Sequence, residues 1–322
     1  MEITGKLMAG FLMVSALLTW NALSGETQST QPDWMKTSVK PRKAEPALSS
    51  EFELESSYVG ASELRQGSAK KGDIDGELQN SVSYVASIPA GDGWRLRVGA
   101  AYERYDFGLP AASFLPNHFQ SANAVIGADV NLSDKWLMRL ELHPGVYSDF
   151  RNVRVDDVNI PAIVGFSYLV NSRLQWFFGL GIDPRFGVAM RNFMDSPVFP
   201  GVGVRWQFAD DWTLMALLPK PEIQYKINEQ WEAFAGAELM GGNYRMNDHF
   251  GDEVGRQDLN NEMLSYREIR TGLGLRYKFH PAFTAELNGG YMVDREFRFG
   301  GRDLTLHTDP APYGALQLKA NF

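Results

Sequence analysis

The feature that most constrains this chain is an alternation of apolar and polar residues with a period of two, recurring from about residue 51 to the last residue. In WRLRVGAAYERY, residues 94–105, even-numbered positions up to Tyr102 are apolar and odd-numbered positions up to Glu103 are charged or small. RLQWFFGLGID (173–183) and IRTGLGLRYKF (269–279) repeat the scheme. Successive side chains of a β-strand point to opposite faces, and the 3.6-residue period of helices is scarce here. The pattern predicts an all-β fold whose strands have one apolar and one polar face.

The alternation continues to the end of the chain. In APYGALQLKANF, residues 311–322, Leu316, Leu318 and Ala320 alternate with polar residues, and the segment ends on Phe322. Terminal residues usually fray unless something holds them. We therefore expect the last strand to pair with the first, near residues 50–58, so that the sheet closes on itself.

Short and long connections alternate between the predicted strands. A barrel that spans the outer membrane has short periplasmic turns, long extracellular loops and aromatic residues at the membrane interfaces. Trp94, Trp136, Trp212 and Trp231 each follow a short turn closely. The short breaks are expected at 89–93, 133–135, 171–173, 209–211, 228–230 and 280–282, and the longer ones at about 60–75, 107–119, 149–158, 184–198, 246–261 and 298–310.

The segment 212–228 decides the strand count. Read as one strand, it makes the total odd and places the chain ends on opposite sides of the membrane. A proline cannot sit inside a paired strand, so Pro219 and Pro221 favour a hairpin that turns at this point. The hairpin predicts about 14 strands, an even number as in single-chain bacterial barrels, with 12 as the alternative count. Each arm is short, since ~9–11 residues are needed to span a bilayer.

The N-terminus reads as an export signal. An uncharged apolar run from Leu7 to Trp20 is followed by Ala22 and Ser24 at the spacing of a cleavage site. The alternative is a membrane anchor, although the run is shorter than the ~20 residues of a spanning helix. We expect a signal peptide over residues 1–24, a disordered segment over 25–50, which is rich in Ser, Thr, Pro and charge, and the barrel over 51–322.

Composition excludes several classes of function. The chain of 322 residues has no cysteine and a net charge of −8. Disulfides and thiolate metal sites are therefore ruled out, and the negative charge argues against a nucleic-acid partner. No motif indicates a cofactor.

These features together resemble a bacterial outer-membrane β-barrel. More narrowly, the segments at 200–208, 217–242 and 309–322 are similar to an uncharacterised family of such barrels. The resemblance implies the outer membrane of a Gram-negative bacterium, contact with its lipid, and recognition of Leu316, Leu318 and Phe322 by the barrel-assembly machinery. Ala320 departs from the pattern, because an aromatic residue is common there. The oligomeric state stays open.

The polar faces are expected to line the lumen. If the lumen is wet, these charges line a passive pore with weak ion preference; alternatively, they pair with one another and fill a narrow interior. Inward glycines either leave open space or mark strong bending of the strands. The candidate lumen-lining charges are Arg95, Arg97, Glu103, Arg139, Glu141, Arg205, Glu238, Arg270, Arg276 and Glu286.

Catalytic and metal sites find little support in the sequence. Among five histidines, only His143, beside Arg139 and Glu141 on an inner face, stands as a candidate catalytic group. No catalytic residue and no metal ligand is assigned. Acidic residues in two loops could hold Ca²⁺, but they do not match EF-hand spacing, so solvated loops are the simpler interpretation. They are Asp156, Asp157, Asp248, Asp252 and Glu253.

The sequence thus predicts a porin-like outer-membrane barrel that acts as a passive pore or uptake channel for small solutes. The first alternative is a closed structural barrel whose surface loops bind a partner. A membrane enzyme is a further alternative. A soluble β-sandwich would show the same alternation without the membrane.

Overall fold

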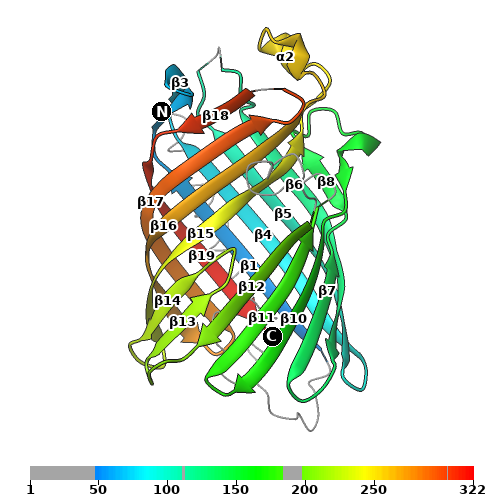
Figure 1. The fold of residues 1–322 in the computed structure, drawn as a ribbon, viewed down its shortest axis with the longest axis vertical. Coiled ribbons are helices and arrows are strands. Elements are labelled where there is room, and N and C mark those ends of the chain that lie inside the picture. The colour runs from blue at the N-terminus through cyan, green and yellow to red at the C-terminus, as the bar shows by residue number, and fades with distance from the viewer. Residues whose placement is uncertain (1–47, 111–112, 184–197, 303) are drawn as a thin grey trace.

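The computed structural model describes residues 48–110, 113–183, 198–302 and 304–322, which form a closed antiparallel β-barrel of 14 strands (Figure 1). The predicted signal peptide and nearly all of the predicted disordered segment lie outside these ranges. Among the described residues, no helix is long and apolar enough to cross a membrane. The wall strands, in order, are β1 (Ser49–Val59), β4 (Glu77–Gly91), β5 (Trp94–Phe107), β6 (His118–Asn131), β7 (Trp136–Leu142), β10 (Ala162–Asn171), β11 (Leu174–Ile182), β12 (Val198–Trp206), β13 (Trp212–Ala216), β14 (Glu222–Lys226), β15 (Trp231–Arg245), β16 (Met263–His280), β17 (Phe283–Phe299) and β19 (Ala311–Asn321).

The barrel closes between its first and last strands. β1 and β19 pair antiparallel from Glu51 opposite Asn321 to Val59 opposite Tyr313. Ser50 and Phe322 exchange two backbone hydrogen bonds of 2.9 Å, each N–H donating to the other's carbonyl oxygen. The predicted pairing of the chain ends is therefore confirmed, and β1 begins two residues before the predicted start of the barrel.

The two faces of the wall differ as the alternation predicts. In β5, Trp94, Leu96 and Val98 are 50%, 46% and 49% exposed on the outside, whereas Arg97, on the inside, is 4% exposed. In hydrocarbon, backbone groups must find partners within the protein, and a closed sheet provides them. The apolar outer face is therefore suited to lipid.

Short turns join the strands at one end of the barrel, called here the turn end. Gly93 closes the β4–β5 turn with a φ of 76°, in the left-handed region that side chains rarely adopt. Both described chain ends, at residues 48 and 322, also lie at this end. The predicted aromatic girdle is confirmed here, since the tryptophans are partly exposed and three of them pack on tyrosines: Trp136 on Tyr168, Trp212 on Tyr225 and Trp231 on Tyr277.

Longer connections gather at the opposite end, called the loop end, at the top of Figure 1. In outer-membrane barrels this end faces the outside of the cell. Several connections carry structure of their own: β2 (Ser62–Gln66), β3 (Ala69–Ile74), β8 (Gly145–Ser148), η2 (Val155–Asp157), β9 (Val158–Asn159), α2 (Phe250–Glu253), η4 (Gln257–Leu259) and β18 (Leu304–Thr308).

The predicted hairpin at the prolines is confirmed, and it is shorter than the neighbouring strands. β13 and β14 have 5 residues each. Their connection, residues 217–221, bends toward the barrel interior: Leu217 is 7% exposed, and Lys220 lies 3.1 Å from the carboxylate of Glu286 on β17. The hairpin therefore completes the wall only near the turn end.

The barrel narrows toward the loop end. β8 pairs with β6 from Gly145 opposite Asn123 to Ser148 opposite Gln120. On its other side, Ser148 pairs with Arg245 of β15 in parallel. Among the described strands, β8 alone joins β6 to β15 at this level. Strands β10 to β14 belong only to the wall of the wider part, nearer the turn end.

Candidate functional site

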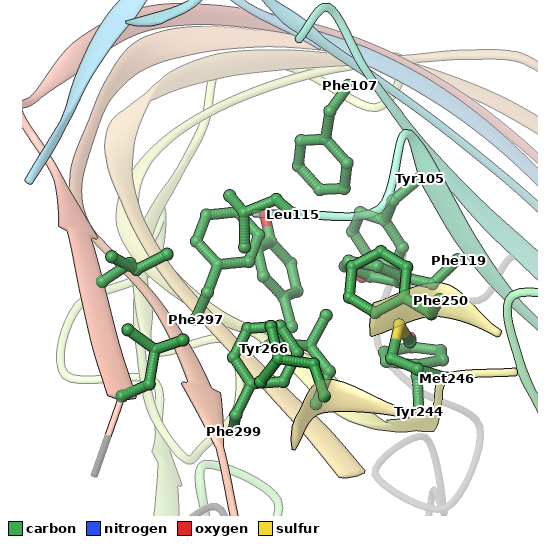
Figure 2. Packing of buried hydrophobic residues seen from close by; sticks show 14 of the residues in the cluster. Tyr105, Phe107, Leu115, Phe119, Tyr244, Met246, Phe250, Tyr266, Phe297 and Phe299 are labelled. Carbon is green, nitrogen blue, oxygen red and sulfur yellow. The ribbon is translucent and has the colours of Figure 1, made fainter. Parts of the chain in front are cut away.

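An aromatic cluster fills the narrow loop end of the barrel; we call it the plug. Figure 2 shows its rings pointing toward one another inside the wall. Phe119 of β6 lies at its centre, with ring centroids 5.1 Å from Tyr105, 4.3 Å from Tyr244 and 5.1 Å from Tyr266. The plug consists of Leu64, Ile74, Tyr105, Phe107, Leu115, Phe119, Tyr244, Met246, Phe250, Leu259, Leu264, Tyr266, Phe297, Phe299, Leu304 and Leu306, all buried.

The plug ties the loops of this end together. Leu115 comes from the β5–β6 connection, Phe250 and Leu259 from the β15–β16 connection, and Leu304 and Leu306 from β18. Phe250 stacks on Phe299 with centroids 6.3 Å apart. The described wall strands and loops therefore share one apolar core, which fills the narrow loop end.

Ion pairs link two of these loops on the outside. Arg151 and Arg154 of the β7–β10 connection pair with Glu253 and Asp248 of the β15–β16 connection. Glu253 and Asp248, two of the acidic residues considered as Ca²⁺ ligands, are therefore paired with arginines. Asp156 and Asp157 lie near Arg245, at 3.9 and 4.0 Å. Among the residues that the structure describes, no cluster of histidine and acidic side chains is arranged to hold a metal.

Within the β15–β16 connection, Arg256 donates to Asp258 in a forked pair, at 2.8 and 2.7 Å. The hydrogen bond from Arg256 holds the pKa of the Asp258 carboxyl below its usual range. The exposed charges of this loop are therefore largely paired, either within the loop or with the β7–β10 connection.

A desolvated charge cluster lies directly beneath the plug. Arg295 contacts Glu77 at 2.7 Å and Glu268 at 2.8 Å, and Arg270 also pairs with both glutamates. All four side chains are at most 1% exposed. The Tyr266 hydroxyl donates to Glu77 at 2.9 Å, which connects the cluster to the plug. This layer contains two cations and two anions, so its charge is balanced.

A second cluster surrounds Arg276 of β16. Its guanidinium donates to Glu222, Glu232 and Glu286 at 2.6, 2.7 and 2.7 Å. Its carbon also lies 4.0 Å from the centre of the Phe234 ring. Lys220, from the hairpin tip, adds a second cation beside Glu286. Carboxylates from β14, β15 and β17 are thereby held around one arginine.

A third cluster lies on β5, β6 and β7. Arg97 donates to Glu141 at 2.5 Å, and Arg139 makes a forked pair with Asp129 at 2.6 and 2.7 Å. The Arg97 guanidinium also lies 3.4 Å from Glu51. Opposite charges again satisfy one another across neighbouring strands.

The other predicted lumen charges have individual surroundings. Glu103 accepts hydrogen bonds from Gln79 at 2.9 Å and from Tyr105 at 2.7 Å. Arg95 donates to the Ser49 hydroxyl and the Ser87 carbonyl, both at 2.8 Å. Glu238 lies 3.9 Å from Lys220. The Arg205 Nε is buried without a hydrogen-bond partner in the described part of the chain.

The inward glycines fall into two groups. A Cβ atom added at Gly99, Gly127, Gly203, Gly236, Gly272 or Gly274 would meet another atom at 2.1, 2.4, 2.4, 2.5, 2.5 or 2.2 Å. These glycines are needed for close approach of the wall. At Gly165 and Gly201 the same atom would meet no described residue within 4 Å, and at Gly179 only a backbone oxygen of the described chain at 3.6 Å. No described side chain therefore crowds these three positions.

The three glycines form one row across adjacent strands. Gly165 of β10 is opposite Gly179 of β11, which is opposite Gly201 of β12. Their neighbours Phe178, Leu180 and Val202 are 41%, 42% and 65% exposed on the lipid side. Because successive side chains alternate between faces, the row points inward. This glycine row lies in the wide part of the barrel, away from the plug.

His143 lies at the loop-end side of the third cluster. Its Nε2 is 3.5 Å from the Glu141 carboxylate, and its backbone N–H donates to the Pro161 carbonyl. No serine hydroxyl bonds to a histidine ring among the described residues. Among the described residues, His143 is therefore not paired with a serine hydroxyl as covalent catalysis by a serine would require.

Several residues of the interior were not singled out from the sequence. Glu77, Glu268 and Arg295 complete the most buried charge cluster, and the plug aromatics were not recognised as inward-facing. The alternation itself carries a signal for some of them: Tyr105 and Phe107 follow Glu103 in phase on the inner face. An aromatic residue in phase with inward charges therefore indicates a filled barrel end.

Several solved structures resemble this barrel at low sequence identity. The toluene transporter TodX of Pseudomonas putida has a TM-score of 0.45 and 10% identity, over 85% of this chain and 90% of that chain. An outer-membrane channel of Pseudomonas putida F1 has a TM-score of 0.44 and 8% identity, over 88% and 100% of the two chains. A FadL homologue of Pseudomonas aeruginosa has a TM-score of 0.33 and 9% identity, over 86% and 90%. These are distant likenesses, and the barrel assignment stands on the strand pairing itself.

The sequence comparisons give a family. No curated protein matches the chain. Residues 47–321, which include every strand of the barrel, match the family described as "Domain of unknown function (DUF6268)". The chain belongs to this family.

Proposed function

We propose that this protein is an outer-membrane channel for small solutes, whose outer mouth is closed by the plug in the conformation described. The observation that carries the proposal is the glycine row, where three adjacent wall strands carry no side chain at one level of the inner face. A barrel that served only as a scaffold would be expected to fill its interior with wall side chains, because close packing stabilises it. No described residue lies within 4 Å of a Cβ added at Gly165 or Gly201.

The remainder of the interior restricts where a solute could pass. The charge cluster beneath the plug is fully desolvated and the cluster around Arg276 is mostly buried, so together they occupy the β4, β16 and β17 side. The glycine row lies on β10, β11 and β12. We therefore place the passage off the barrel axis, along the glycine row, and expect small conductance rather than that of a wide porin.

A closed structural barrel that presents loops to a partner is the second candidate. The observation in its favour is the plug itself, together with the ion pairs between the β7–β10 and β15–β16 connections. The two candidates differ in one property: only a channel lets ions or solutes cross a bilayer.

Single-channel recording in planar bilayers tests the proposal. We expect small conductance steps from the wild-type protein and a loss of roughly half or more of that conductance in Gly201→Trp, because the indole would occupy the passage. Val202→Trp is the matched control, since its side chain faces lipid from the neighbouring position. A heat-dependent shift in gel mobility would establish that each variant is folded. Equal conductance in both variants would favour the structural barrel, as would silence of the folded protein after the plug has been loosened by substitution.

A further inference from the structure

A strip of exposed apolar side chains follows the β7–β10 connection at the loop end; we call it the apolar strip. Single exposed apolar residues are common on protein surfaces, whereas contiguous ones mark an interaction surface. Val155 is 87% exposed, and the other members are 46% to 50% exposed. The apolar strip consists of Val153, Val155, Val158 and Ile160.

The direction of Val158 is given by strand pairing. Val158 of β9 is opposite Val146 of β8, which is opposite Ala122 of β6. Ala122 lies on the outer face of β6, because Phe119, three positions away on the same strand, points into the plug. Val158 therefore faces outward, and its neighbour Asn159 is buried on the inner side.

Two further members of the strip share this direction. Val155 begins the 3₁₀-helix η2, and Val158 follows directly after it. Residues three apart in such a helix eclipse one another, which places Val155 on the same side as Val158. Ile160 follows Val158 by two residues and is in phase with it on the extended chain. These side chains thus continue the outer face of β8 and β9.

The height of the strip matches the edge of a membrane. Tyr168 of β10 belongs to the aromatic girdle at the turn end, and Val158 precedes it by ten residues of largely extended chain. Ten residues rise ~33 Å along a strand, which is about 25 Å along the axis of a barrel with strands tilted by ~40°. The apolar band of such barrels is about 25 Å tall. Figure 1 shows the connection at the flank of the barrel, beside β8. The strip therefore lies where the acyl chains of the outer leaflet meet the headgroups.

Charged residues of the same connection turn toward the protein. Arg151 and Arg154 pair with Glu253 and Asp248 of the β15–β16 connection. Asp157 is buried, and its carboxylate accepts a hydrogen bond of 2.9 Å from the backbone N–H of Arg154. Apolar groups on one side and charges on the other are typical of segments that lie in a membrane interface.

We propose that the β7–β10 connection is a membrane anchor, whose apolar strip inserts among the acyl chains of the outer leaflet. Lipid is the occupant because the strip is continuous with the lipid-facing wall, where Ile126 and Leu142 are 50% and 39% exposed just below β8. Through its arginines, the anchor also holds the β15–β16 connection, which supplies Phe250 and Leu259 to the plug. The inference concerns lipid contact and does not depend on conductance.

Spin labelling tests the anchor directly, because the chain has no cysteine and each variant carries a single thiol. Val155→Cys is labelled with a nitroxide and reconstituted in vesicles of phosphatidylethanolamine and phosphatidylglycerol. Its relaxation is measured with oxygen, which concentrates in hydrocarbon, and with a nickel chelate, which stays in water. Val202→Cys is the reference for lipid, since this side chain of the outer wall is 65% exposed. Asp252→Cys in the β15–β16 connection is the reference for water, and Asp156→Cys is the matched neighbour on η2.

We expect the ratio of oxygen to nickel collisions at Val155 to exceed that at Asp252 at least about threefold, because an interfacial apolar side chain lies ~5–10 Å inside the boundary. The label at Asp156 should resemble the label at Asp252. Nickel collisions at Val155 as frequent as at Asp252 would overturn the anchor and leave the strip free for a protein partner. Oxygen collisions at Asp156 equal to those at Val155 would overturn the sidedness on which the inference rests. A heat-dependent shift in gel mobility establishes that each variant is folded. Since none of these results measures conductance, the anchor and the channel stand or fall separately.

Discussion

At the scale of single residues, the interior is organised by arginines that are shared among several carboxylates. Arg276 is 3% exposed and holds Glu222, Glu232 and Glu286 at 2.6 to 2.7 Å. Removal of one partner from a buried ion pair leaves an uncompensated charge in the interior. The resulting loss of stability is far larger than the stabilisation that an exposed ion pair provides. Here three carboxylates would lose the same partner.

Arg276→Met is therefore expected to lower the free energy of unfolding by about 3–5 kcal/mol. The matched control is Arg173→Met, whose pair with Asp210 is exposed on a turn. That substitution should change stability by no more than about 1 kcal/mol. Urea unfolding of the purified proteins in micelles, followed by tryptophan fluorescence, measures both. Equal stability of the two variants would mean that the interior is hydrated around Arg276.

The glycines show why sequence alone could not distinguish closely packed positions of the wall from uncrowded ones. Gly99 and Gly201 occupy the same kind of position, inward-facing and between apolar outward neighbours. The two positions differ in how crowded they are. This crowding depends on how closely the neighbouring strand approaches the glycine, which is set by the register and curvature of the sheet. An added Cβ would lie 2.1 Å from the Tyr84 carbonyl oxygen at Gly99 and near no described residue at Gly201. Alternation predicts the direction of a side chain, but not the space in front of it.

At the scale of elements, the strand faces, the proline hairpin and the closure of β19 on β1 could all be predicted, because each depends on local pattern. The loops could not. Their contribution to the plug arises from Phe250, Leu259 and Leu304, which are isolated apolar residues within irregular segments. Nothing local distinguishes a loop residue that packs into the mouth from one that faces water.

The last strand carries a prediction about assembly. Phe322 is 61% exposed, and its ring packs edge-on against Phe283 with centroids 5.5 Å apart. Loss of this aromatic pair in Phe322→Ser should change the stability of the folded barrel by no more than about 1.5 kcal/mol. The backbone hydrogen bonds to Ser50 remain in the variant. In cells, however, most of the variant should fail to reach the folded, heat-modifiable form, as the proposed recognition of Leu316, Leu318 and Phe322 requires.

Phe208→Ser provides the comparison, because Phe208 is also a partly exposed aromatic at the turn end. Quantification of folded protein in the outer-membrane fraction should show little change for it. Normal assembly of Phe322→Ser, or an equal defect in both variants, would contradict a specific role of the last strand.

At the scale of the whole molecule, the barrel has a wide part near the turn end and a narrow loop end filled by the plug. The narrowing depends on β8, a strand of 4 residues that joins β6 to β15. This long-range contact has no counterpart in the local alternation, and for that reason the sequence could not decide between a wet pore and a filled interior. The structure shows the filled arrangement at the loop end.

In the proposed function, the plug closes a barrel whose interior could otherwise conduct. Single-channel recording of the double variant Phe250→Ser/Leu259→Ser tests it most directly, since both residues hold the β15–β16 connection in the plug without belonging to a wall strand. Losing buried apolar contacts at two positions costs about 2–5 kcal/mol each, enough to release the loop. We predict larger or more frequent steps than in wild type, a return toward silence when Gly201→Trp is added, and wild-type behaviour for Asp252→Ser. Unchanged conductance in the folded double variant would contradict the account.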